Sequence, residues 1–171
     1  LNKEISLPEF QSFIFEKKQF ETQNFSKKNN LILLNINNLS YLDETIQMMK
    51  ENYICFINHD EVYNYSDLPR KFNKTSIDEY ISFLNTKKIE CKTFSNFENF
   101  FGFFEKSEFS KVFTFYPSIG YELDFLSSQF KKFGVNLNFI YDEFDTLCWK
   151  HSSSGFFKFK TKIPDFVSQI N

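Results

Sequence analysis

The sequence predicts an α/β protein: a three-layer, doubly wound sandwich around a five-stranded parallel sheet of Rossmann-like order 3-2-1-4-5. Three observations lead to this fold class. Five short apolar runs have the length and the β-branched or aromatic content of strands. Segments with apolar residues at helical spacing lie between these runs, and strands that alternate with helices form parallel sheets. Right-handed crossovers then place helices on both faces of the sheet.

The predicted strands are the five apolar runs. The first, second and fourth runs are nearly continuous in apolar residues, which is typical of strands covered on both faces. In chain order the runs comprise residues 31–36, 53–57, 89–94, 111–116 and 136–141.

The first and last of four predicted helices have clear boundary signals. Ser40 or Asp43 can cap the first helix, which carries Ile46 and Met49 on one face. The last helix is predicted from about residue 118 to 133. It ends before Gly134, a residue suited to the left-handed conformation that terminates helices.

The two middle helices each begin with the pattern of a capping box. Ser76 pairs with Glu79 at the start of one, and Ser95 pairs with Glu98 at the start of the other. Apolar residues follow at helical spacing in both segments, and the phenylalanine stripe of the second is typical of a packed core. These apolar residues are Ile77, Tyr80, Ile81 and Leu84, and then Phe97, Phe100, Phe101 and Phe104.

The α/β domain is predicted to span residues 31–149. Residues 1–30 contain one amphipathic helix and a polar linker, and residues 150–171 form a closing segment. In that segment two phenylalanines alternate with two lysines over residues 157–160, which predicts a short exposed strand or a docking segment.

Composition excludes several classes of function. The net charge of −2 and the pI of about 5.8 argue against a strongly basic nucleic-acid-binding face. No apolar run approaches the ~18 residues that cross a bilayer, so no membrane partner is expected. Cys55, Cys91 and Cys148 lie far apart, within or beside apolar stretches, which predicts free thiols in the cytoplasm and neither disulfide nor metal site.

Chemistry is expected beyond the carboxyl ends of the strands, where the strand order reverses. The loops after the first and fourth strands flank that crevice, and neither carries a glycine-rich phosphate motif. Asparagine amides and tyrosine hydroxyls there can hydrogen-bond the edge of a heterocycle while aromatic faces stack on it. The predicted binding residues are Asn37, Asn38, Tyr116, Ser118, Tyr121 and Glu122.

Other polar clusters are interpreted as structural or solvated. The stretch 59–61, His-Asp-Glu, and the acidic stretch with Asp142, Glu143 and Asp145 are expected to be solvated loops. Trp149, the single tryptophan, is expected to be a packing anchor. No catalytic residue is predicted.

Four stretches carry a resemblance to a known family. They are residues 38–44, which read Asn-Leu-Ser-Tyr-Leu-Asp-Glu; Arg70 and Phe72 ahead of 77–81; residues 121–135; and 155–161, a glycine followed by aromatic residues and Thr161. With the order of elements from about 31 to 166, they resemble the N-terminal α/β domain of the DNA photolyase/cryptochrome family. Asn38 and Ser40 stand where that family has an aspartate and an arginine.

The resemblance implies a non-catalytic, antenna-type domain. It implies that the crevice holds an antenna folate or deazaflavin. It also implies that FAD binds a helical domain, which these residues do not contain and toward which residues 150–171 lead. Light-driven DNA repair, a deoxyribodipyrimidine photo-lyase activity, or blue-light sensing would need that domain in cis, and DNA would be contacted only through it. Two alternatives stay open: a stand-alone nucleotide-binding domain, and a ligand-free interaction domain of the same Rossmann-like fold.

Overall fold

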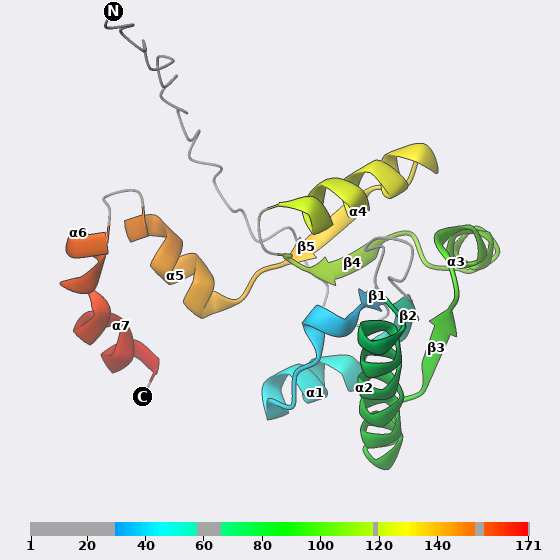
Figure 1. Cartoon of the computed structure of the whole chain (residues 1–171), viewed down its shortest axis with the longest axis horizontal. Coiled ribbons are helices and arrows are strands. Elements are labelled where there is room, and N and C mark those ends of the chain that lie inside the picture. The colour runs from blue at the N-terminus through cyan, green and yellow to red at the C-terminus, as the bar shows by residue number, and fades with distance from the viewer. Residues whose placement is uncertain (1–29, 58–65, 118–119, 153–155, 171) are drawn as a thin grey trace, which may run out of the picture.

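The computed structural model describes residues 30–57, 66–117, 120–152 and 156–170 (Figure 1). It confirms the predicted α/β sandwich with a five-stranded, all-parallel sheet of order β3-β2-β1-β4-β5. The predicted N-terminal helix lies outside the described residues. The strands are β1 (Leu31–Leu34), β2 (Tyr53–Ile57), β3 (Cys91–Phe94), β4 (Val112–Phe115) and β5 (Leu137–Ile140).

Four helices, α1 to α4, pack in two layers, one on each face of the sheet. One layer contains α1 and α2, and the other contains α3 and α4, as the two separate core clusters show. A single 3-10 turn, η1, follows β1, and three further helices follow β5. The bounds are η1 (Ile36–Asn38), α1 (Asp43–Lys50), α2 (Asp67–Thr86), α3 (Phe97–Phe104), α4 (Tyr121–Lys132), α5 (Glu143–Ser152), α6 (Phe156–Lys160) and α7 (Ile163–Ile170).

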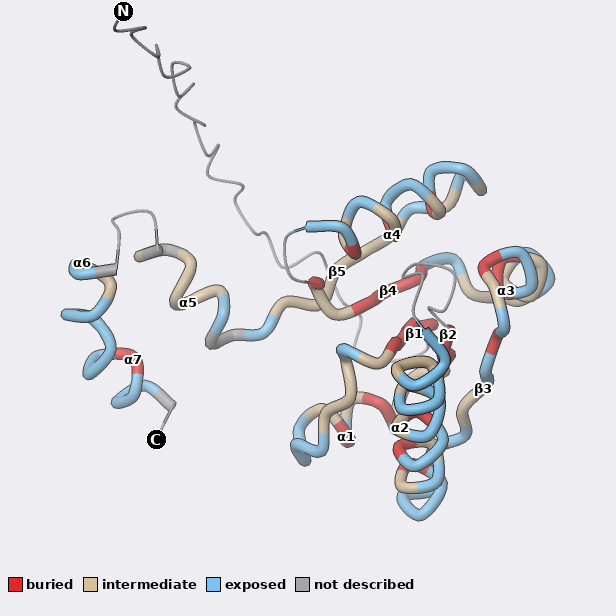
Figure 2. The backbone as a smooth tube through the Cα atoms, in the orientation of Figure 1, coloured by how far each residue is buried: buried red, intermediate tan, exposed pale blue. Residues whose placement is uncertain are grey.

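The central strand β1 is buried along its whole length (Figure 2). Leu31 and Leu33 belong to the core under α3 and α4, whereas Ile32 and Leu34 belong to the core under α1 and α2. Alternating side chains of one strand therefore fill both cores, as the period of two in a strand requires. The chain extends the sheet from β1 to β2 and β3, and then crosses over to add β4 on the other side of β1.

Phenylalanine rings dominate the core beneath α3 and α4. Phe100 is fully buried and contacts the rings of Phe94, Phe101 and Phe130 at centroid distances of 5.5, 5.1 and 6.2 Å. In a chain without alanine, tilted and edge-on rings fill this interface between helix and sheet. Lys92, on the edge strand β3, places its ammonium 4.0 Å from the ring centroid of Phe103.

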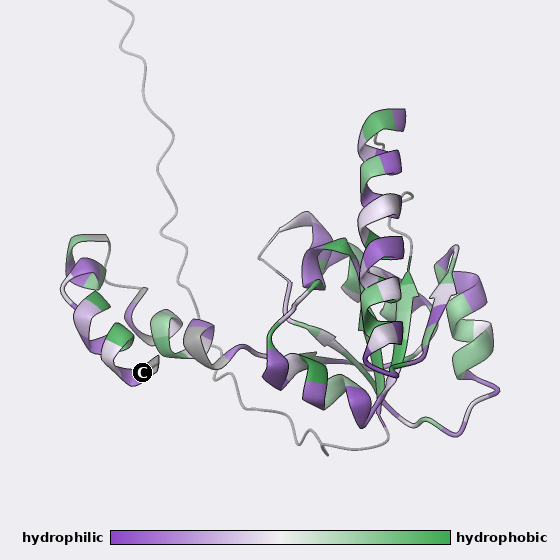
Figure 3. Cartoon of the chain, turned by 90° about the horizontal axis from the view of Figure 1, so that it is seen from below, coloured by the Kyte–Doolittle hydropathy of each residue, from purple (hydrophilic) through white to green (hydrophobic). Residues whose placement is uncertain are grey.

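The starts of the two middle helices differ from the prediction. Helix α2 begins at Asp67, so Ser76 and Glu79 lie inside it and form no capping box. The apolar pattern begins at Ile77 because only the second half of α2 is buried against the sheet, while Leu68 and Phe72 in the first half are exposed. Figure 3 shows α2 projecting past the neighbouring elements, with hydrophilic and hydrophobic residues along it.

The third predicted helix begins one residue later than expected. The N-cap of α3 is Asn96 rather than Ser95, and its side chain accepts a hydrogen bond from the backbone N–H of Asn99. Ser95 instead accepts a hydrogen bond from the Asn99 side chain. The fourth helix, α4, begins at Tyr121, and Gly134 follows it with the predicted left-handed φ of 66°.

Two predictions for the C-terminal part were wrong. The acidic stretch after β5 is not a loop: it opens α5, and the Asp142 carboxylate accepts the N–H of Asp145 at that helix start. Residues 157–160 lie in the short helix α6, so the strand prediction is wrong, while the alternative of a docking segment stays a prediction. The helix separates the two phenylalanines, so that Phe159 packs on the buried Phe166 of α7 while Phe157 is 84% exposed. None of the described helices combines the length and apolar content needed to cross a bilayer.

The burial of Phe100 leads to a test of the core. Replacement by alanine (Phe100→Ala) removes a fully buried ring and should lower the free energy of unfolding by about 3–5 kcal/mol. Phe72→Ala, which removes an exposed ring from α2, is the control and should change it by less than about 0.5 kcal/mol. Urea unfolding followed by circular dichroism measures both, and equal losses would contradict this description of the core.

Candidate functional site

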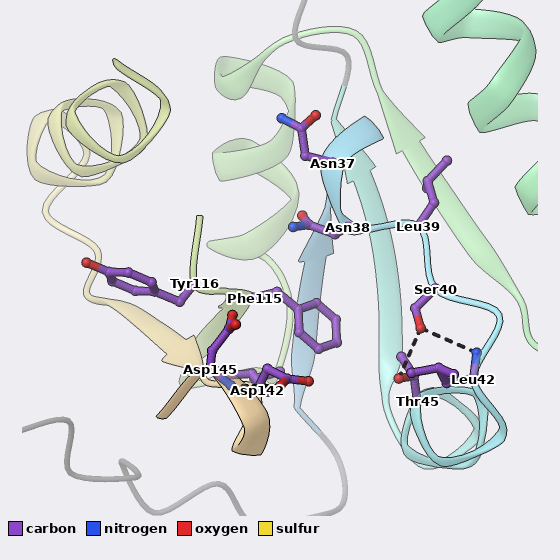
Figure 4. A pocket seen from close by; sticks show the side chains of 11 residues that line it. Asn37, Asn38, Leu39, Ser40, Leu42, Thr45, Phe115, Tyr116, Asp142 and Asp145 are labelled. Atoms are coloured by element: carbon purple, nitrogen blue, oxygen red, sulfur yellow. Dashed lines mark hydrogen bonds between the residues drawn. The ribbon is translucent and has the colours of Figure 1, made fainter. Parts of the chain in front are cut away.

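A pocket of about 220 Å³ lies at the carboxyl end of the sheet, between the loops that follow β1 and β4. This is the place where the strand order reverses, and the start of α5 closes one side of it (Figure 4). The lining residues come from four segments of the chain. They are Asn37, Asn38, Leu39, Ser40, Leu42, Thr45, Phe115, Tyr116, Ile140, Asp142 and Asp145.

The loop after β1 is held in shape by its own asparagines. The side chain of Asn35 caps η1 by accepting the backbone N–H of Asn37 at 2.7 Å. The side chain of Asn38 accepts the backbone N–H of Asn35 at 3.2 Å, which completes a capping box. Asparagine suits both positions because its short amide reaches nearby backbone groups. Asn37 and Asn38 are thereby placed at the pocket.

Glu122 ties this loop to the start of α4. Its side chain is 6% exposed, and its two oxygens accept hydrogen bonds from the amides of Asn35 (2.8 Å) and Asn37 (2.7 Å). Glu122 lies in the first turn of α4, where the helix dipole favours a negative charge. The two loops that flank the pocket are therefore joined through one buried carboxylate.

The wall on the side of α1 is anchored by Tyr80 of α2. The Tyr80 hydroxyl donates to the backbone oxygen of Ser40, and the backbone N–H of Ser40 donates to the Tyr80 hydroxyl oxygen at 3.3 Å. Burial raises the pKa of Tyr80, so its hydroxyl remains protonated at neutral pH. The hydroxyls of Ser40 and Thr45 lie 3.3 Å apart on this wall.

The opposite wall is aromatic. Tyr116 follows β4, and its ring lies 5.0 Å from that of Tyr141 and 5.4 Å from that of Trp149 on α5. These contacts confirm Trp149 as a packing residue. The hydroxyls of Tyr116 and Tyr141 are neutral at pH 7, as tyrosine hydroxyls ordinarily are, and burial raises the pKa of both groups further. Phe115 and Ile140 complete the apolar part of the lining.

Asp142 and Asp145 bring negative charge to the pocket. Figure 4 shows the side chain of Asp145 extending from α5 toward the end of β4, beside Phe115 and Tyr116. Desolvation, and then the charge of Asp142, raise the pKa of Asp145 above its usual value. These two carboxylates are the only charged groups among the eleven lining residues, all of which the structure describes.

The predicted site residues fall into three groups. Asn37, Asn38 and Tyr116 line the pocket. Glu122 lies behind it as a support, and Tyr121 is 62% exposed, stacks on Phe125 and does not line it. Ser118 and the stretch 59–61 lie outside the described residues. The binding role of these residues stays a prediction.

Sequence reasoning missed the acidic side of the pocket. Asp142 and Asp145 were interpreted as a solvated loop, although they follow the fifth strand at the same edge of the sheet. Their place after a predicted strand was the signal that could have found them. Thr45 had no such signal, because it lies inside α1.

The cysteines are free, as predicted, and lie outside the pocket lining. Cys55 is buried, and burial raises its pKa to about 12; Cys91 is partly buried, with its pKa raised to about 11 for the same reason. Both thiols are protonated at neutral pH and are poor nucleophiles. Within the described residues, no three potential metal ligands gather in one place.

The support by Glu122 can be tested by substitution. Glu122→Ala leaves the buried Asn35 amide without an acceptor and should lower the free energy of unfolding by about 2–3 kcal/mol. Glu122→Gln should cost about half as much. Its carbonyl can still accept from Asn35, and the more exposed Asn37 amide can turn to present its oxygen. Asp124→Ala, an exposed acid on the same helix, is the control, and a loss as large as that of Glu122→Ala would contradict the role of Glu122.

The raised pKa of Asp145 predicts a pH-dependent stability difference. Above the folded-state pKa, the charged carboxylate disfavours the native state, and this effect disappears below the unfolded-state value of 3.8. Asp145→Asn should therefore be more stable than the wild type at pH 7, by less than about 0.5 kcal/mol because the group is exposed, and equally stable at about pH 3. Thermal unfolding at both pH values measures this, and a variant that is less stable at pH 7 would refute it.

Comparisons of the chain with protein-family models, with curated proteins and with solved structures found no match. The resemblance to photolyases and cryptochromes therefore stays a prediction from the sequence. The strand order and the pocket are properties of the structure itself, and they hold independently of any relative.

Proposed function

We propose that this domain binds one planar heterocyclic ring system in the pocket between the β1 and β4 loops, in the manner of an antenna-type domain. One observation carries the proposal: amide, hydroxyl and carboxylate groups share a pocket with an aromatic wall at the point where the strand order reverses. Pockets at this point of an open α/β sheet are the usual ligand sites of such folds.

The lining matches the two surfaces of a planar ring. Phe115 and Tyr116 offer apolar faces against which a ring can pack. Asn38, the hydroxyls of Ser40 and Thr45, and the carboxylate of Asp145 offer polar atoms to its edge. The volume of about 220 Å³ is below the ~300–1,000 Å³ of pockets that enclose a drug-sized ligand, so one ring system enters and any tail extends into solvent.

The resemblance supports a folate or deazaflavin as the ring system. In that role the domain would absorb light and transfer excitation to FAD in a helical domain joined in cis, which would perform DNA repair or signalling. The domain itself would carry out no reaction.

Titration of the protein with a folate and a deazaflavin, in the dark, tests the proposal. We expect one of them to show a shifted absorption band and to change the emission of Trp149, whose ring touches the pocket residue Tyr116. Thr45→Phe fills the pocket from α1 and should weaken binding at least tenfold. Glu44→Phe adds the same bulk one residue earlier, at an exposed position outside the pocket lining, and should bind as the wild type does.

Two results would contradict the proposal. An absence of spectral change with both chromophores would remove the antenna role. Equal binding by Thr45→Phe and the wild type would show that the chromophore lies elsewhere on the protein.

A further inference from the structure

We infer that the pocket selects planar ligands that carry hydrogen-bond donors and no phosphate group, and that it discriminates against nucleotides and phosphorylated flavins. This inference rests on the proposed function, because it specifies which ring-bearing compounds enter the same pocket. It is drawn from the charges of the lining residues and from the hydrogen bonds of the loop after β1.

The charge of the pocket disfavours phosphate. Asp142 and Asp145 line it, and no lysine, arginine or histidine is among the lining residues. Asp43 and Glu44 occupy the first turn of α1, directly beside the lining residues Leu42 and Thr45, and add further negative charge. A phosphate dianion in this pocket would meet repulsion and no paired cation.

The N-terminal turns of the two helices beside the pocket already carry acidic side chains. Phosphate sites in α/β folds commonly use the N-terminal turn of a helix. Here the Asp142 carboxylate accepts a backbone N–H of the first turn of α5, and the first turn of α1 carries its own acidic side chains. No side chain caps α1, but the acidic side chains at both helix starts reduce the positive field that a phosphate would meet.

The backbone donors of the loop after β1 are used within the protein. The N–H of Asn37 donates to the Asn35 side chain at 2.7 Å, and the N–H of Asn38 donates to the Asn35 carbonyl at 3.1 Å. The N–H of Ser40 donates to the Tyr80 hydroxyl at 3.3 Å. A phosphate-binding loop presents such N–H groups to the ligand, whereas in this loop they donate to acceptors within the protein.

The lining consequently offers two carboxylates that accept hydrogen bonds, beside amide and hydroxyl groups that can both donate and accept. The carboxylates of Asp142 and Asp145 only accept hydrogen bonds when ionised, and the backbone donors opposite them are engaged. A ligand that brings ring N–H, amino or hydroxyl groups can donate hydrogen bonds to these two carboxylates. An uncharged or cationic heterocycle fits this requirement, and a phosphorylated one does not.

Riboflavin and FMN form a matched pair for the test, because they share the ring system and differ by one phosphate. Binding to the intact protein is measured by flavin fluorescence and by the emission of Trp149, at low salt. We expect riboflavin to bind at least tenfold more tightly than FMN. High salt should reduce this ratio, since it screens the repulsion between exposed charges.

Charge-neutral variants assign the selectivity to the two aspartates. The double substitution Asp142→Asn and Asp145→Asn should reduce the riboflavin-to-FMN affinity ratio below about threefold; asparagine at 142 also caps helices well, so α5 is retained. Asp78→Asn removes one exposed carboxylate from α2, outside the pocket lining, and should leave the ratio unchanged. Thermal unfolding of each variant confirms that it is folded.

The outcomes separate this inference from the proposed function. FMN binding as tightly as riboflavin, or a ratio that the double variant leaves unchanged, would overturn the selectivity while the binding function stands. Riboflavin that fails to bind, with a positive folate or deazaflavin titration, would also overturn the inference alone. A failure of every ring compound to bind would overturn both.

Discussion

The structure depends on one constraint: the strand β1 must be covered on both faces. Its four residues alternate between two hydrophobic cores, so helices are required above and below the sheet. Because β2 and β4 lie on opposite sides of β1, the chain first extends the sheet toward β2 and β3, and then crosses back over the sheet to add β4 on the other side of β1. The loops after β1 and β4 therefore run away from each other at the carboxyl end of the sheet, and the pocket lies between them. A hydrophobic requirement at the centre of the sheet thus determines where the polar site lies.

Hydrophobic burial places the two loops next to each other, but it does not determine their conformation. That is the contribution of Glu122, which accepts amides from Asn35 and Asn37 and so joins the loop after β1 to α4. A buried carboxylate is costly unless hydrogen bonds replace its water shell, and here two amides and the N-terminal turn of a helix supply that replacement. No cation takes part in these two bonds. The two hydrogen bonds of Glu122 therefore support the loop beside the pocket without placing a cation there.

The sequence predicted the sheet well and the site only in part, for physical reasons. The strand at Tyr53–Ile57 was located to the residue, because five consecutive apolar residues between polar neighbours leave little ambiguity. The start of α2 was missed because its first half is exposed and carries no core-facing pattern. Asn37 and Asn38 were placed at the pocket because they directly follow the first predicted strand, and Tyr116 because it ends the fourth. The supporting contacts of Glu122 could not be predicted, because they are hydrogen bonds between residues 85 and 87 positions apart, which no local pattern encodes.

The fold determines where the site lies, but it does not determine the chemistry of the site. The doubly wound architecture specifies a crevice at the reversal of strand order, and many domains with this architecture use that crevice for phosphates. In this chain the atoms at the crevice have other roles: the N–H groups of Asn37 and Asn38 are engaged by Asn35, and Asp142 occupies the start of α5. What remains is two carboxylates, together with neutral amide and hydroxyl groups, beside an aromatic wall. An inference from fold alone would assign a nucleotide to this pocket, whereas its two carboxylates and its engaged backbone N–H groups favour a ligand that brings its own N–H and O–H groups.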